Sequence, residues 1–284
     1  MILLTGITGK TGGAVARALL KRGAKFRALV RDQAKAAEWA DQGVEVVEGN
    51  LNDSASVEAA LDGCSKAVLI LPNSMEQQAM ELAFIASAKK MGVQHFVKLS
   101  SPEAVAGTSS PIPLVHLAAE QAIRDSGMNY TIIRPHFFMQ NLMGSTNGAR
   151  ESGKLVMPMG EGNISPTDCN DAGEFFAEIL LSDDSKHLGK SYDLSGPDLL
   201  DFSQVAAIIA EVLGRDVSYL AADSKAFQEK MRPFVTSDWH SDAVATLFGE
   251  IADKTTPGHV ETTFQEIMGR PPKSLKQMLQ ETFG

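Results

Sequence analysis

The sequence predicts an α/β protein whose core is a doubly wound parallel sheet flanked by helices. Short apolar runs alternate with longer helical stretches through the first half of the chain, and several of these runs are apolar on both faces. Strands buried on both faces are typical of the centre of a parallel sheet. Short connections between strands and helices then favour right-handed crossovers that place helices on both sides.

Six segments of the first half are predicted to be strands, because each is short, apolar and bounded by turn residues. They lie at 1–5, 25–31, 44–48, 66–71, 94–99 and 129–134. The stretches between them are rich in alanine and leucine, which favours helices packed against a sheet. These helices are expected at 11–22, 33–41, 54–61, 75–91 and 113–126, with Asp53 or Ser54 capping the third and Gly127 ending the fifth.

The second half of the chain breaks this alternation and predicts a smaller, mostly helical C-terminal lobe. Residues 151–166 are rich in Gly, Pro and Met, as expected for loop with a short strand. Residues 201–213 form an amphipathic helix ended by Gly214. The other expected elements are helices at 136–148 and 169–182, a strand at 190–194, and three or four helices over 221–284.

The composition of the 284-residue chain is that of a globular protein, with 44% hydrophobic and 21% charged residues. The net charge of -9, with no basic run, argues against direct nucleic-acid binding. No segment approaches the ~18 apolar residues of a membrane span, and no signal peptide is evident, so a cytoplasmic location is expected. Cys64 and Cys169 are expected to be reduced. The sequence contains no His/Cys cluster with metal-ligand spacing, so no structural metal is expected.

The junction between the first strand and the first helix holds a glycine turn with GxxGxxG spacing from Gly6 through Gly9 to Gly12. Glycine permits a tight turn and lets the backbone approach a pyrophosphate without an intervening Cβ. The free N–H groups and the dipole of the following helix favour the same phosphates. The motif therefore predicts a Rossmann-type dinucleotide-binding domain, and the alternative is a merely tight turn.

The residue after the second strand indicates which dinucleotide fits. An acidic side chain there hydrogen-bonds a ribose 2′-hydroxyl, whereas a basic one accommodates a 2′-phosphate. Arg31 ends this strand and Lys10 adds a positive charge, so NADP(H) is expected in preference to NAD(H). Asp32 competes for the assignment but also suits the N-cap of the next helix. The alternative for Arg31 is a solvated surface arginine.

Longer stretches of the sequence resemble the NmrA-like group of atypical short-chain dehydrogenase/reductases. They are TGITGKTGG at 5–13, ALVRD at 28–32, VEGNLND at 47–53, KLSS at 98–101, HLAAEQAIRDSGMNYTIIRP at 116–135, FMQN at 138–141 and IMGRPPKSLKQML at 267–279. The resemblance covers nearly the whole chain and implies NAD(P)(H) binding. It also implies either a reductase of quinones, dyes and similar conjugated acceptors or a redox-sensing regulator that has lost catalysis.

The Tyr-x-x-x-Lys pair of ordinary short-chain dehydrogenases is absent from the sequence, because none of Tyr130, Tyr192 and Tyr219 is followed four residues later by lysine. By similarity, Ile112 stands at the tyrosine position and His116 at the lysine position. His116 is therefore the candidate catalytic residue, placed to bridge the nicotinamide ribose or to deliver a proton. The alternative is a helix histidine that hydrogen-bonds nearby backbone.

The remaining candidates follow the strands at the edge where ligands of such sheets bind. Several apolar side chains have two interpretations: they could form an apolar wall for a flat acceptor, or ordinary core between the lobes. These side chains are Phe137, Phe138, Met157, Met159 and Trp239. The residues expected to bind coenzyme are Gly6, Thr8, Gly9, Lys10, Thr11, Gly12, Arg31, Asn50, Leu51, Leu71, Pro72, Ser100, His116, Pro135 and Phe137. The residues expected to bind substrate are Phe138, Asn141 and Trp239.

Two functions follow from this reading. The first is an NADPH-dependent reductase passing hydride to a small conjugated acceptor, without nucleic acid or membrane as a partner. The second is a non-catalytic NADP(H) sensor that would bind a protein partner. In either case, residues 1–150 are expected to form the coenzyme domain, joined by the strand near 190–194, and residues 151–284 the smaller substrate or lid lobe.

Overall fold

The computed structural model of the chain describes residues 1–182, 185–232, 235, 237–256 and 258–284. They form two units, each assembled from separate stretches of sequence. The first unit comprises Met1–Ala104, Val115–Arg134 and Cys169–Tyr192, and the second comprises Val105–Leu114, Pro135–Asp168 and Asp193–Gly284. The division of the chain near residue 150 stays a prediction.

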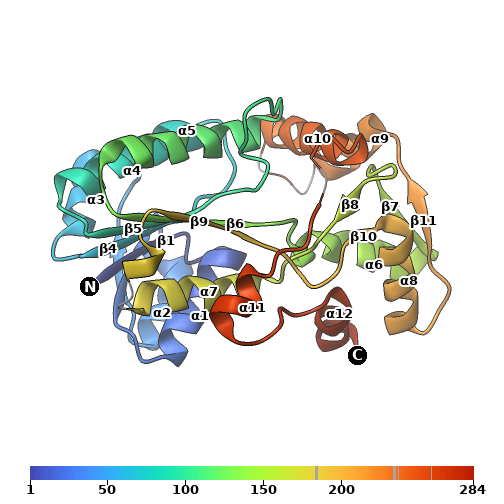
Figure 1. Cartoon of the computed structure of the whole chain (residues 1–284), viewed down its shortest axis with the longest axis horizontal. Coiled ribbons are helices and arrows are strands. Elements are labelled where there is room, and N and C mark those ends of the chain that lie inside the picture. The colour runs from blue at the N-terminus through green and yellow to red at the C-terminus, as the bar shows by residue number, and fades with distance from the viewer. Residues whose placement is uncertain (183–184, 233–234, 236, 257) are drawn as a thin grey trace. The chain divides into compact units, whose positions relative to one another are not determined.

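The first unit is built on a seven-stranded sheet (Figure 1), and the predicted doubly wound α/β class is confirmed. The strand order is β3-β2-β1-β4-β5-β6-β9, and neighbouring strands from β3 to β6 are parallel. Chain order reverses between β1 and β4, the kind of switch point at which such sheets bind ligands. The strands are β1 (Ile2–Thr5), β2 (Phe26–Val30), β3 (Glu45–Glu48), β4 (Lys66–Leu69), β5 (His95–Leu99), β6 (Tyr130–Pro135) and β9 (Lys190–Leu194).

Helices cover both faces of this sheet (Figure 1), with α3, α4 and α5 on one side and α1 and α7 on the other. The expected helix at 33–41 is divided into a 3-10 turn at Gln33–Ala36 and a short helix, α2, at Ala37–Asp41. The other helices agree with the predicted ranges to within about two residues: α1 (Lys10–Lys21), α3 (Ser54–Leu61), α4 (Gln77–Lys90), α5 (Pro111–Ser126) and α7 (Cys169–Leu181).

The predicted helix ends depend on local chemistry that the structure reproduces. Asp53 accepts a hydrogen bond from the Ala55 N–H at 3.1 Å, and Asp32 accepts one from the Ala34 N–H at 3.0 Å. Gly127 follows α5 with a φ of 74°, a left-handed conformation that favours glycine. The N-cap role considered for Asp32 is therefore confirmed.

Helices α1 and α7 touch through small residues. A Cβ added to Gly173 would lie 2.5 Å from the backbone carbonyl carbon of Ala14, so only glycine allows this approach. An exposed ion pair between Arg22 and Glu178, at 2.7 Å, joins the same two helices. Exposed pairs of this kind contribute little. The close backbone packing is therefore the main contact.

The second unit has its own hydrophobic core, which contains Met157 and Met159 as fully buried side chains. Both methionines lie in the core of this unit and leave no surface for a pocket wall, whereas the core between the lobes stays a prediction. Its strands are β7 (Lys154–Met157), β8 (Asn163–Ile164), β10 (Leu200–Asp201) and β11 (Ser218–Ala221), with β11 parallel to β7 and β10 antiparallel to β8.

The helices of the second unit largely match the sequence prediction. The helix expected at 136–148 begins later, as a 3-10 turn at Met139–Leu142 that continues into α6 (Met143–Ser152). The predicted amphipathic helix is α8 (Phe202–Leu213), ended by Gly214 in a left-handed conformation. Among the described residues that follow, the helices are α9 (Ser224–Met231), α10 (Asp238–Ala252), α11 (Thr263–Met268) and α12 (Leu275–Phe283).

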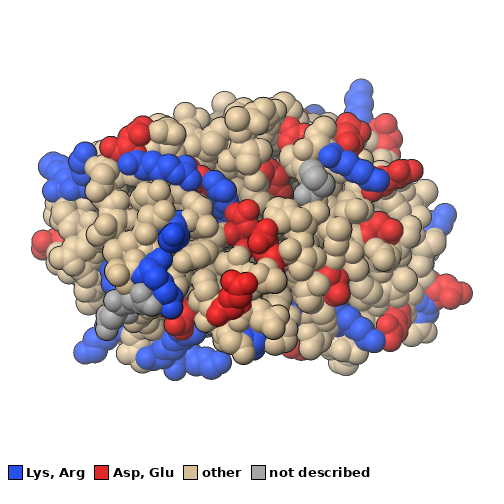
Figure 2. Space-filling model, in the orientation of Figure 1, with Lys and Arg blue, Asp and Glu red and all other residues tan. Residues whose placement is uncertain are grey.

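The surface carries charges of both signs. On the face shown in Figure 2, basic side chains lie in separate groups with acidic side chains among them. Nucleic-acid binding relies on clustered basic residues, and this face offers no continuous basic stripe of that kind. Within the described part of the chain, no helix has both the length and the apolar character needed to cross a membrane.

We predict that stability falls between pH 6.5 and pH 4, in part because of buried His95. Its Nε2 lies 2.8 Å from the Thr131 hydroxyl, which donates to the His187 carbonyl. Burial, followed by the charge of Lys66, lowers the pKa of His95 to about 4. The unfolded chain therefore takes up a proton before the folded one does, and folding stability is lost as the pH falls.

The measurement is urea unfolding at pH 7 and pH 4.5 for the wild type and His95→Gln, whose amide can still reach Thr131. A shift of this size corresponds to at most roughly 3 kcal/mol. The variant should lose clearly less stability than the wild type on acidification. An identical loss in both proteins would contradict the prediction.

Candidate dinucleotide-binding site

The glycine turn after β1 is so tightly packed that side chains cannot replace Gly6 or Gly12. Gly6 has a φ of 72°, and a Cβ there would lie 2.5 Å from the Ile70 carbonyl oxygen. A Cβ on Gly12 would lie 2.1 Å from the Gly6 carbonyl oxygen. Thr5 holds the ends of β1 and β4 together, because its hydroxyl accepts from the Ile70 N–H at 2.9 Å and donates to the Ile70 carbonyl at 3.0 Å.

Helix α1 presents its N-terminus at this turn. It begins at Lys10, and no side chain forms a capping hydrogen bond at its N-cap residue, Gly9. The first turn carries no acidic residue, and Thr8, Gly9 and Lys10 are exposed. Uncapped N–H groups beside a glycine cradle form a typical anion-binding site. The turn thus has the chemistry that the sequence predicted for a pyrophosphate site.

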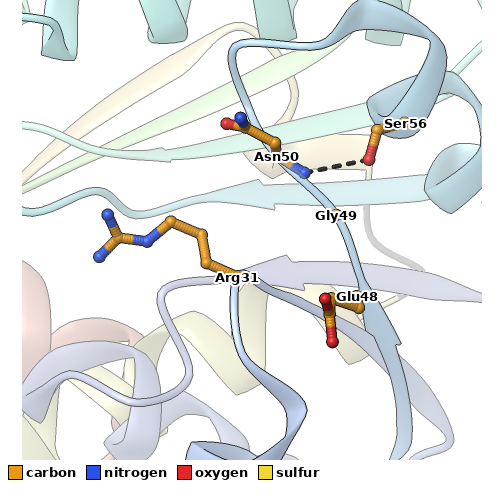
Figure 3. Close-up of a pocket in the computed structure, with 5 residues that line it drawn as sticks. All are labelled: Arg31, Glu48, Gly49, Asn50 and Ser56. Atoms are coloured by element: carbon orange, nitrogen blue, oxygen red, sulfur yellow. Dashed lines mark hydrogen bonds between the residues drawn. The ribbon is translucent and has the colours of Figure 1, made fainter.

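A pocket of about 420 Å³ lies at the carboxyl ends of β2 and β3 (Figure 3), and its lining residues are Arg31, Glu48, Gly49, Asn50 and Ser56. The Ser56 hydroxyl accepts from the Asn50 N–H at 3.0 Å, which fixes the loop after β3. A Cβ on Gly49 would lie 2.3 Å from the same hydroxyl oxygen, so a side chain here would displace Ser56. Arg31 and Asn50, both predicted to bind coenzyme, are therefore brought together.

The Arg31 side chain is exposed and makes no hydrogen bond or ion pair with any described residue. Figure 3 shows its guanidinium and the Asn50 amide extending toward the same side of the pocket, while the Glu48 carboxylate lies on the strand below. An exposed guanidinium without a protein partner can bind a phosphate through two parallel hydrogen bonds. Glu48 was not predicted, although its position at the end of the predicted strand at 44–48, two residues before Asn50, was the available signal.

The remaining candidates of the first unit also follow its strands. Leu51 and Leu71 are half-buried and pack against the hydrophobic core, whereas Pro72 is exposed. Ser100 is buried, and its hydroxyl donates to Glu120 at 2.6 Å. Ser100 therefore serves the internal structure of the unit, and its predicted contact with coenzyme stays a prediction.

Glu120 is a buried carboxylate with several ion-pair and hydrogen-bond partners, and the sequence did not predict this role. Its carboxylate accepts from Ser100, from Arg134 Nε at 2.7 Å and from Arg124 at 3.0 Å. Burial alone would raise the pKa of Glu120, but the hydrogen bonds from Arg134 and Ser100 outweigh it and hold the pKa below its ordinary value. The carboxylate thereby joins α5 to the ends of β5 and β6.

His116, the candidate catalytic residue, takes part in a second buried polar cluster. Its Nδ1 lies 3.2 Å from the ammonium of Lys98, which also donates to Glu81 and to the Leu99 carbonyl, each at 2.8 Å. Lys98 and Glu81 are fully buried, and His116 is 8% exposed. Burial, followed by the positive charge of Lys98, holds the pKa of His116 well below its usual value.

Five predicted residues belong to the second unit, and their roles stay predictions. Pro135 is buried, Phe137 packs against the core of the unit with its ring centroid 6.1 Å from that of Phe248, and Asn141 is exposed. Phe138 and Trp239 are half-buried, and the Phe138 backbone is bridged to Thr167. For Phe137 the core interpretation is supported.

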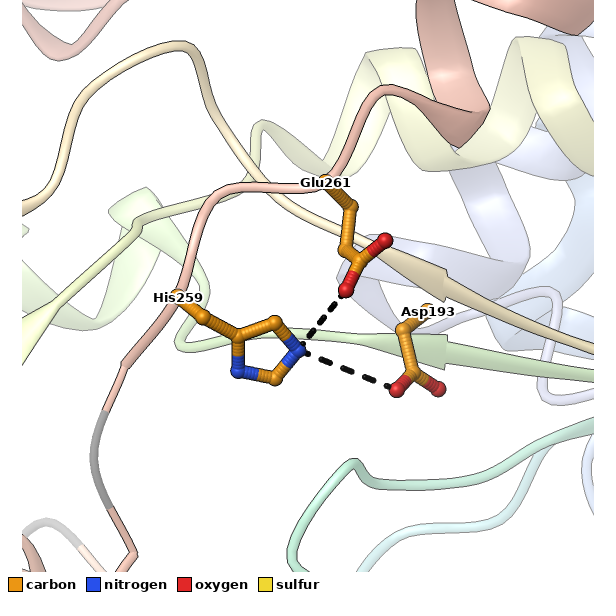
Figure 4. Close-up of side chains that lie close together, drawn as sticks. All are labelled: Asp193, His259 and Glu261. Carbon is orange, nitrogen blue, oxygen red and sulfur yellow. Dashed lines mark ion pairs between the residues drawn. The ribbon is translucent and has the colours of Figure 1, made fainter.

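A polar cluster of the second unit was also not predicted. His259 Nε2 lies 3.0 Å from Glu261 and 4.0 Å from Asp193 (Figure 4). The His259 ring packs edge-on against buried His136, with ring centroids 4.4 Å apart. Ser165 donates to the His259 carbonyl at 2.6 Å and lies 3.2 Å from His136 Nδ1. Such side chains are potential metal ligands, and the cluster is partly exposed.

The strand order and the glycine turn define a Rossmann-type dinucleotide-binding class. The chain belongs to the NmrA-like family, whose model matches residues 1–268. The family inferred from sequence motifs is therefore confirmed.

Relatives of known name extend this finding. The NAD(P)H azoreductase of Xenophilus azovorans is 33% identical over 98% of this chain and 96% of its own length. Quinone oxidoreductase 2 of Escherichia coli is 27% identical over 100% and 99% of the two chains. The structure of the E. coli NADPH-dependent quinone oxidoreductase with NADPH has a TM-score of 0.90 at 26% identity, covering 100% of both chains. Citrobacter triphenylmethane reductase with NADP(H) has a TM-score of 0.88 at 26% identity, covering 99% of both.

We predict that Gly12→Ala lowers the free energy of unfolding by about 1–3 kcal/mol, because the new Cβ would force the Gly6 backbone to move. The matched control is Gly148→Ala within α6, where an added Cβ meets no atom within 4 Å. This control should raise stability by about 0.5–1 kcal/mol, since alanine is the better helix former. Urea unfolding checks both values. Equal stability of the Gly12→Ala variant and the wild type would show that the junction is looser than described.

Proposed function

We propose that the protein is an NADPH-dependent oxidoreductase that transfers hydride to a small conjugated acceptor, such as a quinone or a dye. The observation that carries this proposal is the unpaired guanidinium of Arg31, in a pocket of the same unit that holds the uncapped glycine turn. A 2′-phosphate and a pyrophosphate are the groups that two such anion sites suit. NADPH carries both.

The residues of the first unit fit the coenzyme in separate roles. The backbone from Gly6 to Gly12 has room for a pyrophosphate because no Cβ intervenes, and the N-terminus of α1 favours its charge. Arg31 would hold the 2′-phosphate, and Asn50 with Leu51 would lie along the adenine. NADPH, when bound, supplies the hydride, and the protein contributes binding, orientation and a fixed electrostatic environment.

The acceptor class is supported by the relatives and by the chain's own chemistry. Relatives matching nearly the full chain are named for azo, quinone and triphenylmethane reduction. The sequence lacks the Tyr-x-x-x-Lys acid, which disfavours a simple alcohol dehydrogenase. A reduced quinone is a stabilised anion that water can protonate. Hydride transfer to such an acceptor therefore needs no strong positioned acid.

The regulatory alternative receives less support. A sensor without catalysis would also need the glycine turn and Arg31, so the coenzyme site alone does not separate the two functions. The names of the relatives at 33% and 27% identity describe reductases. We therefore propose catalysis as the function of this chain, with no protein partner required.

We predict that Arg31→Ala weakens NADPH binding by ~1.5–3 kcal/mol, about tenfold to a hundredfold, because a charge-assisted contact is lost. NADH binding should change by less than about twofold, since NADH carries no 2′-phosphate. Glu48→Gln is the matched control, because it removes a charge from the same pocket and leaves the guanidinium in place. That variant should keep or improve NADPH affinity. Calorimetric titration measures the affinities of the wild type and both variants, and equal losses for both coenzymes in Arg31→Ala would exclude the 2′-phosphate assignment.

The activity itself is tested by NADPH oxidation with a panel of quinones, azo dyes and triphenylmethane dyes. We expect turnover with at least one acceptor and a higher kcat/KM with NADPH than with NADH. The Arg31→Ala variant should reduce this preference between coenzymes while keeping turnover of the acceptor. Tight NADPH binding without turnover of any acceptor would reject the reductase and favour the sensor.

A further inference from the structure

The buried ammonium of Lys98 determines which nitrogen of His116 carries the proton. An ammonium has three N–H donors and no acceptor. Its three partners are Glu81 Oε1 at 2.8 Å, the Leu99 carbonyl at 2.8 Å and His116 Nδ1 at 3.2 Å. Since Lys98 can only donate, Nδ1 must accept. The proton of the neutral ring therefore resides on Nε2.

The protonation state of the ring follows from the same surroundings. The charged groups near it are Lys98 on β5, Glu81 on α4 and Glu120 one turn further along α5. Lys98 is the one in direct contact, and its positive charge and the burial of the ring both disfavour an imidazolium. Glu81 balances the charge of Lys98 within the cluster. His116 is thus a neutral imidazole at physiological pH.

The other ring nitrogen, Nε2, has no described protein partner. Nε2 makes no hydrogen bond to any described residue, and it is not among the described polar atoms that are fully buried without a partner. A neutral imidazole whose N–H has no protein acceptor can donate a hydrogen bond to a ligand but does not readily give up its proton. It suits an oxygen acceptor, such as a ribose hydroxyl or the oxygen of a reduced quinone.

We propose that Lys98 is a positioning residue that fixes His116 in the neutral Nε2–H tautomer, so that His116 offers a hydrogen-bond donor to an oxygen atom of the coenzyme or acceptor rather than a transferable proton. The identity of that oxygen rests on the proposed reductase function, whereas the tautomer does not. Of the two roles considered for His116, bridging by a hydrogen bond is therefore selected over proton delivery. The proton that completes reduction comes from water.

The tautomer is tested on the protein without coenzyme, by long-range proton–nitrogen NMR of ¹⁵N-labelled protein, with His116 assigned from a His116→Gln spectrum. We expect Nδ1 to appear unprotonated and Nε2 protonated, without change from pH 6 to pH 8. Lys98→Met alone would leave the buried carboxylate of Glu81 without its cationic partner, with only the neutral Gln77 amide donating to it at 3.0 Å among the described residues, so the comparison uses Lys98→Met with Glu81→Gln. In this double variant the nitrogen signals should shift toward a mixture of tautomers. A protonated Nδ1 in the wild type, or unchanged signals in the double variant, would overturn the proposal.

The hydrogen-bond role is tested by two amide variants. The glutamine amide of His116→Gln reaches the position of Nε2, whereas the asparagine amide of His116→Asn reaches only that of Nδ1, where it can still accept from Lys98. We expect His116→Gln to keep the wild-type function within about threefold and His116→Asn to lose about tenfold, the equivalent of one hydrogen bond. A loss in NADPH affinity identifies a ribose oxygen, and a loss in kcat/KM for the acceptor identifies the acceptor oxygen.

These outcomes separate the inference from the proposed function. The expected tautomer with no turnover of any acceptor would reject the reductase and leave the role of Lys98 intact. Turnover together with equal activities of His116→Gln and His116→Asn would support the reductase and overturn the hydrogen-bond role. The pH dependence of kcat gives a further test. If the wild-type rate fell as a group with a pKa near 7 lost its proton, and the His116 variants did not show this fall, His116 would act as an acid and the hydrogen-bond role would be overturned.

Discussion

The close approach of backbone to backbone at the end of β1 is the constraint on which the first unit depends. The carbonyl oxygen of Gly6 occupies the space where a side chain at position 12 would lie, and the carbonyl of Ile70 does the same for Gly6. Thr5 closes the same corner with two hydrogen bonds to Ile70. Backbone fills this corner in place of side chains, and α1 begins beside it without a side-chain cap at Gly9.

The fold was predictable because its signals are local. Apolar runs at strand length, Asp53 and Asp32 at helix starts, and Gly127 and Gly214 at helix ends each determine structure within a few residues. The elements that the sequence missed, β10 and β11, are only two and four residues long, and β11 is largely exposed. So short an exposed strand leaves little hydrophobic pattern to detect.

The candidate site was predictable only in part, because only some of its residues are marked by signals that are local in the sequence. Arg31 and Asn50 follow strands whose ends could be read from the sequence, and the structure brings them to one pocket. The partners of Glu120 and Lys98 come from elements far apart in the chain, so no spacing in the sequence marks them. Buried charges of this kind are stable only when paired, and pairing is a property of the folded chain. For Met157, hydrophobic character alone did not distinguish a core residue from a pocket wall.

The interleaving of the two units along the chain has a consequence for biosynthesis. A nascent polypeptide that ends before Cys169 contains most strands of the first unit but neither α7 nor β9. The surface of α1 around Ala14, which packs against Gly173 in the finished molecule, therefore stays uncovered while the intervening segment of the second unit emerges from the ribosome. The first unit is therefore complete only after this late segment has been synthesised, and contacts so far apart in the sequence form slowly.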